Sequence, residues 1–343
     1  MTRVALIGLG MVAGTYVDAI SKLPDIQIGG VFARTADSRA AFLETHGLDA
    51  KNYGSIAEIA DDPDIGFAIV TTPPNARADI VAMLAKAGKP ILMEKPVERT
   101  LAGATELVET CETAGVPLGI ALQHRTKPVV QDLLRVLPDL GALAMVEVHV
   151  PWWRPQSYYA EPGRGRYDRD GGGVMITQAI HTFDLMLSLA TPLAGPVTDV
   201  TAMTATTALH DMESEDFVSA GLRFENGAVG MLSATTAAFP GRAEVIALHC
   251  ANGSARLDTD HLSVDWQDGR SETFGAVTRS GSGANPMAFT SDWHRAIIAD
   301  FDAAVKEGRA PLISGRAALD VHRLIAALEA SAKAGARVDV ERG

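Results

Sequence analysis

Short apolar runs alternate with amphipathic segments along the amino-terminal part of the chain, and this alternation limits the possible folds. The runs predict strands over residues 3–8, 26–33, 66–70 and 117–121, with another strand that starts at Ile91. The first predicted helix ends near Ser21, and the others cover residues 38–46, 76–87 and 101–114. Asp37 is the expected cap of the helix over residues 38–46, and Thr100 is the expected cap of the helix over residues 101–114. The pattern is typical of an α/β domain with a doubly wound parallel sheet.

The strand that starts at Ile91 stops at the sequence Glu94-Lys95-Pro96. Its apolar residues suit a strand that is buried on both faces, and ligands of parallel sheets bind beyond the carboxyl ends of the strands. Lys95 is therefore placed where chemistry would occur, with Glu94 beside it. The same charged pair would also serve simply to solvate the end of a strand.

A glycine-rich turn, Gly8-Leu9-Gly10-Met11-Val12-Ala13-Gly14, separates the first strand from the first helix. Gly8 permits a tight turn, Gly10 lets the backbone approach a pyrophosphate, and the small residues that follow allow close packing of the helix on the strand. The amino end of the helix favours an anion. We therefore expect a dinucleotide to bind at Gly8, Leu9, Gly10, Met11 and Val12.

The end of the second strand indicates which dinucleotide binds. An Asp or Glu at this point would bind the adenosine ribose of NAD, but the sequence has Ala33-Arg34-Thr35. Arg34, together with Arg39, can bind a 2′-phosphate through paired hydrogen bonds. The prediction is NADP(H) in preference to NAD(H). Arg34 would also fit as a solvated loop charge or as a stacking partner of adenine.

Two further strand ends point to the same edge of the sheet. We expect the dinucleotide to be lined there by Thr71, Thr72, Pro73, Asn75 and Gln123. The hydroxyls and the amide would equally serve to cap the next helix. A domain boundary is predicted at Gln123. Residues 1–123 would form the dinucleotide-binding domain and residues 124–343 a domain for substrate binding and oligomerisation, whose carboxyl-terminal helix can pack back on the first.

The second part of the chain has the pattern of an antiparallel sheet. Asn226-Gly227, Asn252-Gly253 and Asp268-Gly269 each separate β-rich runs, which is a strong signal for hairpins. The runs between about residues 198 and 266 have no obvious covering helices, so their apolar face is a predicted interface of a homodimer or homotetramer. Helices are expected over residues 287–307 and 317–334.

A loop over residues 151–170 is rich in aromatic residues and arginines. Aromatic rings pack under the C–H faces of a sugar, and guanidinium groups bind its oxygens. The loop therefore predicts a sugar-like ligand held by Arg154, Tyr159 and Arg164. A subunit interface would use the same residue types almost as well.

Three glycines, Gly171 to Gly173, lead into a predicted helix that carries Thr177, His181 and Asp184. Their spacings of four and three put these side chains on one helix face. A run of glycine indicates that some group approaches the backbone closely, which favours a functional His181 with Thr177 and Asp184 near the substrate. The three residues do not match a zinc site of familiar spacing, so no metal is predicted.

Length and charge limit the remaining possibilities. A chain of 343 residues exceeds the usual size of a single hydrophobic core, which favours two domains. The net charge of −12 argues against nucleic acid or an anionic membrane as a partner. Cys111 and Cys250 form no closely spaced pair, so a reducing, cytoplasmic location is expected. Glycines and Asp18 interrupt the apolar stretch over residues 4–20, which is predicted to be neither a signal peptide nor a membrane span.

The combined motifs resemble the glucose-fructose oxidoreductase/inositol dehydrogenase/MocA family, nearly from end to end. The matching segments are the glycine turn, Glu94-Lys95-Pro96, Gln123-His124-Arg125, the triple glycine with His181 and Asp184, and the stretch from Asp300-Phe301 to Gly308-Arg309-Ala310-Pro311. The resemblance implies a Rossmann domain joined to an α/β domain with a large open, mainly antiparallel sheet. It also implies hydride transfer between a nicotinamide and the carbinol or carbonyl carbon of a sugar, cyclitol or related polyol.

By position, the resemblance implies that Lys95 is the lysine near the nicotinamide and the reacting oxygen, and that His181 is the acid/base histidine. Thr177 departs from the inositol-type enzymes, which carry Asp one turn before this His, so a simple Asp-His relay is not expected. Either Lys95 or His181 fits the role of base. Two other activities fit the same motifs, namely glycoside hydrolysis by transient oxidation with a retained cofactor and a non-catalytic regulator that senses NADP(H).

Overall fold

The computed structural model describes residues 1–275 and 290–343, which divide into two compact units. Unit 1 contains residues 1–123 and 290–319, and the other described residues belong to unit 2. The expected division instead placed every residue after Gln123 in the second domain. Residues 290–319 group with unit 1 because helix α9 (Asp292–Glu307) packs against helix α1 (Ala13–Ser21).

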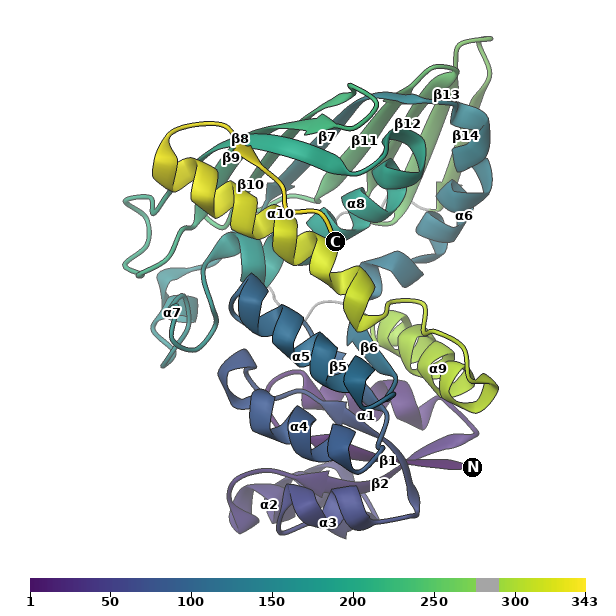
Figure 1. Ribbon diagram of the computed structural model, residues 1–343, viewed down its shortest axis with the longest axis vertical. Coiled ribbons are helices and arrows are strands. Elements are labelled where there is room, and N and C mark those ends of the chain that lie inside the picture. The colour runs from purple at the N-terminus through teal and green to yellow at the C-terminus, as the bar shows by residue number, and fades with distance from the viewer. Residues whose placement is uncertain (276–289) are drawn as a thin grey trace. The chain divides into compact units, whose positions relative to one another are not determined.

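Unit 1 is built on a sheet whose six described strands have the order β3-β2-β1-β4-β5-β6. Figure 1 labels β1, β2, β5 and β6 of this sheet. The strands are β1 (Thr2–Ile7), β2 (Ile26–Phe32), β3 (Lys51–Asn52), β4 (Ile65–Val70), β5 (Ile91–Glu94) and β6 (Leu118–Ala121). All neighbours pair in parallel, which confirms the predicted fold class for this unit. The strand order reverses between β1 and β4, and such a switch point is where doubly wound sheets bind ligands.

The remaining helices of unit 1 are α2 (Ala36–His46), α3 (Ile56–Asp61), α4 (Ala78–Lys86) and α5 (Leu101–Thr113). Helix α4 packs against both α3 and α5. A short 3-10 helix, η1 (Pro74–Ala76), precedes α4, so the helix predicted over residues 76–87 is divided at Arg77. Thr100 caps α5 as predicted, whereas α2 is capped by Thr35 and not by Asp37. The reason is that Thr35 keeps an extended backbone, from which its hydroxyl accepts a hydrogen bond from Ser38 N.

The described residues of unit 2 form a nine-stranded sheet of order β14-β13-β12-β11-β7-β10-β9-β8-β15. Its strands are β7 (Leu143–Pro151), β8 (Val197–Ala205), β9 (Phe217–Phe224), β10 (Val229–Thr235), β11 (Val245–Cys250), β12 (Gly253–Asp258), β13 (His261–Trp266), β14 (Ser271–Gly275) and β15 (Val338–Asp339). Neighbours pair antiparallel except β7 and β10, which are parallel. The three predicted hairpins are confirmed as β9–β10, β11–β12 and β13–β14.

The helices of unit 2 cover one face of this sheet. They are α6 (Pro128–Val136), η3 (Leu137–Leu140), α7 (Gln156–Tyr159), the π-helical turn η4 (Met175–Ala179), α8 (Ile180–Ala194) and, from residue 320 onward, α10 (Gly315–Ala334). Helix η2 (Gln123–Thr126) joins β6 to this unit. Helix α8 packs on β7 and β11, and α6 packs on β13 and β14. The helix expected from residue 287 is seen from Asp292, and residues 287–289 lie outside the described residues.

The other face of the sheet carries exposed apolar side chains. Met203, Val229 and Met231 are 61%, 48% and 55% exposed, and the β8–β9–β10 register puts them on one face. Leu222 and Leu232 occupy the alternate, buried positions of the same strands. This pattern matches an antiparallel sheet with one buried face and one exposed face.

Across the described parts of the chain, no helix combines the length and the apolar character that crossing a membrane would require.

Candidate active site

The glycine turn after β1 is held by the loop that follows β4. Gly8 has a φ of +95°, and a Cβ at this position would lie 2.8 Å from Thr72 N. The Thr71 hydroxyl donates a hydrogen bond to Gly8 O at 2.5 Å. Gly8 is therefore required both by its own backbone conformation and by the neighbouring loop. Thr71, expected to line the dinucleotide, uses its hydroxyl hydrogen to hold this turn.

Gly10 meets a different requirement. A Cβ on Gly10 would contact no described atom within 4 Å, so packing within the protein does not demand glycine here. Gly10 and Met11 are exposed, and Leu9 and Val12 are half-buried. In the described chain, Val12 provides no side-chain cap for α1, and the first turn of α1 holds no acidic residue. Open backbone that leads into an uncapped helix end fits the pyrophosphate of a dinucleotide.

The two arginines near the end of β2 differ in their surroundings. Arg39 donates hydrogen bonds to Ala33 O at 2.7 Å and to Asn52 Oδ1 at 2.5 Å, so it ties the end of β2 to β3. Arg34 is exposed. Arg34 is thus the exposed arginine at this strand end, whereas Arg39 supports the strand end.

The other predicted cofactor residues of unit 1 differ in exposure. Pro73 and Asn75 are exposed on the loop after β4, and Gln123 is buried after β6. The Thr72 hydroxyl is buried, with no hydrogen-bond partner among the described residues. Pro73 and Asn75 are therefore accessible to a ligand, whereas Thr72 acts chiefly through its backbone contact with the glycine turn.

Glu94 at the end of β5 points into unit 1. It is 7% exposed, and its carboxylate accepts hydrogen bonds from Tyr16 Oη at 2.9 Å and from Lys95 N at 3.1 Å. His294 Nε2, from α9, lies 3.5 Å from the same carboxylate. These contacts hold the Glu94 carboxylate inside the unit, and the expected contact of Glu94 with the cofactor stays a prediction. Lys95 itself is partly exposed.

The ionisation of this cluster follows from its burial. Burial raises the pKa of Glu94, but the hydrogen bond and charge of His294, the charge of Lys95 and the hydrogen bond from Tyr16 outweigh it, so the pKa lies below its ordinary value. Burial and the Glu94 charge raise the pKa of Tyr16 well above its ordinary value. At neutral pH a carboxylate thus accepts a hydrogen bond from a neutral phenol beneath the Lys95 turn.

His181 lies at the start of α8, directly after the π-helical turn η4. Its ring stacks on the ring of His124, with centroids 4.9 Å apart and planes at 27°. Both rings belong to unit 2 and both are buried. Turns of π-helix within α-helices often occur at functional sites. The stack restricts the orientation of the His181 imidazole, and the sequence prediction did not include His124 among the candidate site residues.

Thr177 and Asp184 bind partners within unit 2. The Thr177 hydroxyl donates a hydrogen bond to Gly173 O at 2.5 Å. Asp184 has a side chain that is 1% exposed, and Arg125 binds both of its oxygens. Burial raises the pKa of Asp184, and the attraction to Arg125 opposes this rise. A guanidinium of the same unit thus binds the Asp184 carboxylate, and the expected contact of Asp184 with substrate stays a prediction.

The chain itself explains the triple glycine. A Cβ on Gly173 would lie 1.7 Å from Glu215 O. The Glu215 carboxylate accepts hydrogen bonds from Gly173 N and Met175 N, each at 3.1 Å, and so caps the start of the helix. The group that approaches Gly173 is thus the backbone of Glu215 and not a ligand. Glu215 is far away in the sequence, and no local pattern indicated this role.

Part of the aromatic loop over residues 151–170 packs in the interior of unit 2. Arg154 is 2% exposed and lies over the rings of Trp152 and Tyr158, at 5.3 and 5.7 Å. The Tyr159 hydroxyl shares a hydrogen bond of 2.6 Å with Thr236 Oγ1, and the tyrosine is 8% exposed. Both side chains thus pack in the interior of unit 2, and the expectation that Arg154 and Tyr159 hold the substrate stays a prediction.

Arg164 keeps a partly exposed position. It donates a hydrogen bond to Tyr158 Oη at 2.6 Å, and its guanidinium lies 4.3 Å from the centre of the Tyr158 ring. Gln178 Nε2, from the π-helical turn, lies 3.4 Å from the same hydroxyl. Tyr158 and Gln178 therefore join Arg164 to the turn that carries Thr177, and Arg164 stays a candidate for binding substrate oxygens.

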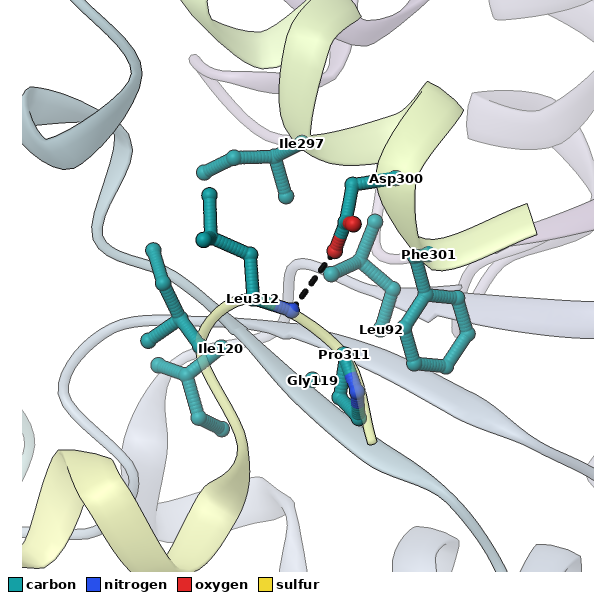
Figure 2. A pocket seen from close by; sticks show the side chains of 9 residues that line it. Leu92, Gly119, Ile120, Ile297, Asp300, Phe301, Pro311 and Leu312 are labelled. Atoms are coloured by element: carbon teal, nitrogen blue, oxygen red, sulfur yellow. Dashed lines mark hydrogen bonds between the residues drawn. The ribbon is translucent and has the colours of Figure 1, made fainter. Parts of the chain in front are cut away.

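A small apolar cavity in unit 1 lies within the packing of α9 on β5 and β6. Figure 2 shows Leu92, Ile120 and Ile297 around it, with Asp300 as its charged lining residue. Asp300 accepts a hydrogen bond from Leu312 N at 2.6 Å and pairs with Arg309 at 2.8 Å. Because this carboxylate is satisfied, the cavity is a gap in the core and not a second polar site.

Comparisons with known proteins find similar chains. The model described as "Oxidoreductase family, NAD-binding Rossmann fold" matches residues 2–122, and the model of the GFO/IDH/MocA C-terminal domain matches residues 138–256. D-apiose dehydrogenase of Paraburkholderia graminis is 27% identical over 98% of this chain and 89% of its own. Inositol 2-dehydrogenase of Rhizobium meliloti is 24% identical over 75% of each chain. The structure of the WlbA dehydrogenase from Bordetella pertussis, in complex with NADH and UDP-GlcNAcA, is 25% identical, covers 99% of both chains and has a TM-score of 0.82.

Proposed function

The chain belongs to the GFO/IDH/MocA family of oxidoreductases, and from this membership we propose that it is an NAD(P)-dependent dehydrogenase or reductase acting on CH–OH groups. It transfers hydride between a nicotinamide and the carbinol or carbonyl carbon of a sugar, cyclitol or related polyol. One observation carries the proposal. Lys95 follows β5, whose neighbour β4 leads into the loop that holds the Gly8 turn. The dehydrogenases of D-apiose and inositol among the relatives support this substrate class.

In this mechanism a bound nicotinamide supplies the hydride acceptor or donor. Lys95 and His181 handle the proton of the reacting hydroxyl. In oxidation, one of them takes that proton as the carbon loses hydride, and in reduction the same group returns it. Lys95 belongs to unit 1 and His181 to unit 2, and the proposal assigns both to one reaction. Arg164 and Thr177 are proposed to contribute to substrate binding.

The proposed cofactor is NADP(H) in preference to NAD(H). Ala33 provides no carboxylate for the adenosine ribose, and Arg34 is exposed beside it. Arg39 supports the strand end through Ala33 O and Asn52. The backbone from Gly8 to Val12 is proposed to bind the pyrophosphate. Pro73 and Asn75 are proposed to line the cofactor too, because they follow β4, which neighbours β1 in the sheet. The Bordetella pertussis relative binds NADH, so the 2′-phosphate is the point that needs testing.

The protein is proposed to be a cytoplasmic homodimer or homotetramer. The exposed apolar face that carries Met203, Val229 and Met231 supports association. Cys111 and Cys250 are both free and buried, which suits a reducing compartment.

The test is a turnover assay of the purified protein with NADP⁺ and NAD⁺. D-apiose, myo-inositol and a panel of aldoses, cyclitols and aryl glycosides serve as substrates. The expected result is net reduction of the added cofactor with at least one polyol or sugar. Glycoside cleavage without net cofactor reduction would instead indicate a redox-cycling hydrolase. Binding of NADP(H) without any turnover would indicate a regulator, and either result would overturn the proposed dehydrogenase.

A further inference from the structure

Arg77 is a buried cation between the loops that follow β4 and β5. It is 2% exposed and lies directly before α4. Its Nε and Nη2 donate hydrogen bonds to Thr72 O, at 3.0 and 2.8 Å. Its Nη1 donates to Glu94 O and Pro96 O. One guanidinium thus binds backbone carbonyls from both loops.

These carbonyls belong to the backbone around Lys95 and to the loop that holds the glycine turn. Glu94 and Pro96 are the residues before and after Lys95, and Thr72 N is the atom that a Cβ on Gly8 would meet. The Lys95 N–H donates to the Glu94 carboxylate. Arg77 therefore holds the carbonyls on either side of Lys95, while Glu94 holds its amide.

Burying a charged guanidinium group costs desolvation free energy. Burial lowers the pKa of Arg77 to about 10, although the charges of Glu94, Tyr16 and Glu98 oppose the fall, so the side chain stays charged at neutral pH. An apolar side chain could fill much of the same volume without desolvating a charge. The gain from Arg77 lies in its planar fork, which binds Thr72 O through Nε and Nη2 and the carbonyls of Glu94 and Pro96 through Nη1, in a fixed geometry that a single lysine ammonium does not reproduce.

We propose that Arg77 is a positioning residue, which fixes the backbone of Lys95 to the loop after β4 and thereby sets the position of the Lys95 amine. The inference rests on the proposed function, because it assigns Arg77 an effect on turnover through Lys95. A displacement of about 1 Å in a reacting group can cost on the order of 10²-fold in rate. Loss of the Arg77 fork would therefore lower kcat more than it weakens cofactor binding.

Two variants and a matched control test this role. Arg77→Lys keeps a buried charge but loses the fork, and Arg77→Met keeps only the apolar stem. The control is Lys89→Met. Lys89 is also a buried cation bound to carbonyls, since it donates to Asp62 O at 2.7 Å and to Ile65 O at 2.9 Å, at the amino end of β4. Lys89→Met should lower stability and leave kcat unchanged.

The first measurement is turnover with the polyol or sugar that the substrate panel identifies. Arg77→Lys should lower kcat by about 10- to 100-fold and leave the cofactor Kd within about threefold. The second measurement needs no turnover. It follows acylation of the Lys95 amine by acetic anhydride, read by peptide mass spectrometry against the exposed Lys86. The Lys95/Lys86 labelling ratio should change at least about threefold in both Arg77 variants and stay constant in Lys89→Met, because acylation needs the neutral amine and the surroundings of a lysine set its neutral fraction. An unchanged ratio in both Arg77 variants would overturn the inference.

The Lys95→Met background separates this inference from the proposed function. If Arg77 acts through Lys95, adding Arg77→Lys to Lys95→Met should lower kcat by less than about twofold further. If the kcat losses of Lys95→Met and Arg77→Lys multiply in the double variant, the positioning role of Arg77 is contradicted and the proposed function is not affected. If Lys95→Met alone keeps the wild-type rate, the proposed function falls, and the labelling ratio still decides whether Arg77 fixes the Lys95 turn.

Discussion

Arg125 binds Asp184 through two hydrogen bonds, from Nε to Oδ2 at 2.7 Å and from Nη2 to Oδ1 at 2.5 Å. The pair joins η2 to α8, and each of these elements carries one ring of the His124–His181 stack. The ion pair therefore supports the histidine that the proposed reaction needs, although neither of its members is assigned to the chemistry.

Removing Arg125 alone should destabilise unit 2, because it leaves the Asp184 charge buried. Breaking a buried pair in this way typically costs about 3–5 kcal/mol. Urea unfolding of Arg125→Met, followed by tryptophan fluorescence, should show a loss near this size, and Arg125→Met/Asp184→Leu should recover part of it. The control is Arg256→Met, which breaks an exposed pair with Asp258 and should cost at most about 1 kcal/mol. Equal losses at the two sites would contradict the prediction.

Lys95→Met should lower kcat by about 10²–10⁴-fold with little change in cofactor affinity, because the glycine turn stays intact. His181→Ala should lower kcat by a similar factor. If the two residues act on one hydroxyl, the double variant should cost far less than the product of the single losses. Steady-state kinetics together with calorimetric cofactor titration check this. Wild-type turnover in Lys95→Met would mean that Glu94-Lys95-Pro96 is only a strand end.

Glu94→Gln should reduce the stability that the carboxylate gives at neutral pH. The folded-state pKa of Glu94 is lowered, so its contribution is present above the unfolded-state pKa of about 4.3 and is lost as pH falls through the folded-state value. The difference in Tm between wild type and Glu94→Gln should therefore be largest near neutrality and should shrink in acid. Melting curves over this pH range test it, with the exposed Glu44→Gln as control. A difference that grows in acid would show the opposite linkage.

Cofactor preference should depend on Arg34. Calorimetric titration should show tighter binding of NADP(H) than of NAD(H), because a guanidinium and not a carboxylate follows β2. Arg34→Ala should weaken NADP(H) by about tenfold and leave NAD(H) nearly unchanged, in line with the loss of a charge-assisted hydrogen bond. Tighter binding of NAD(H) by the wild type would refute the predicted preference.

The open sheet face should be the interface between copies of the chain. Met203→Lys/Met231→Lys places charge on this face and should lower the molecular mass measured by light scattering at micromolar concentration. Met83→Lys is a matched control, since Met83 is 43% exposed on α4 of unit 1. A monomeric mass for the wild-type protein under these conditions would contradict the prediction.

Features that depend on neighbouring residues could be predicted from the sequence. The alternation of apolar runs indicated the parallel sheet, and Asn-Gly and Asp-Gly pairs indicated the hairpins, because turn and strand preferences act over a few residues. Lys95 was placed at a strand end for the same reason. The cap of α2 was assigned to Asp37 and not to Thr35 because either residue type can cap and only the backbone conformation decides.

The partners of the site residues were decided by the tertiary structure alone. Arg77 binds the carbonyls beside Lys95, Glu215 binds Gly173 N, and Arg125 binds Asp184, and the members of each pair lie on different segments of the chain. The sequence predicts Asp184 near the substrate and a close approach of some group to the triple glycine, but it names no protein partner for either. The structure supplies these partners because a buried charge or a closely approached backbone inside a folded unit needs a protein partner, and only the packing of distant segments provides it.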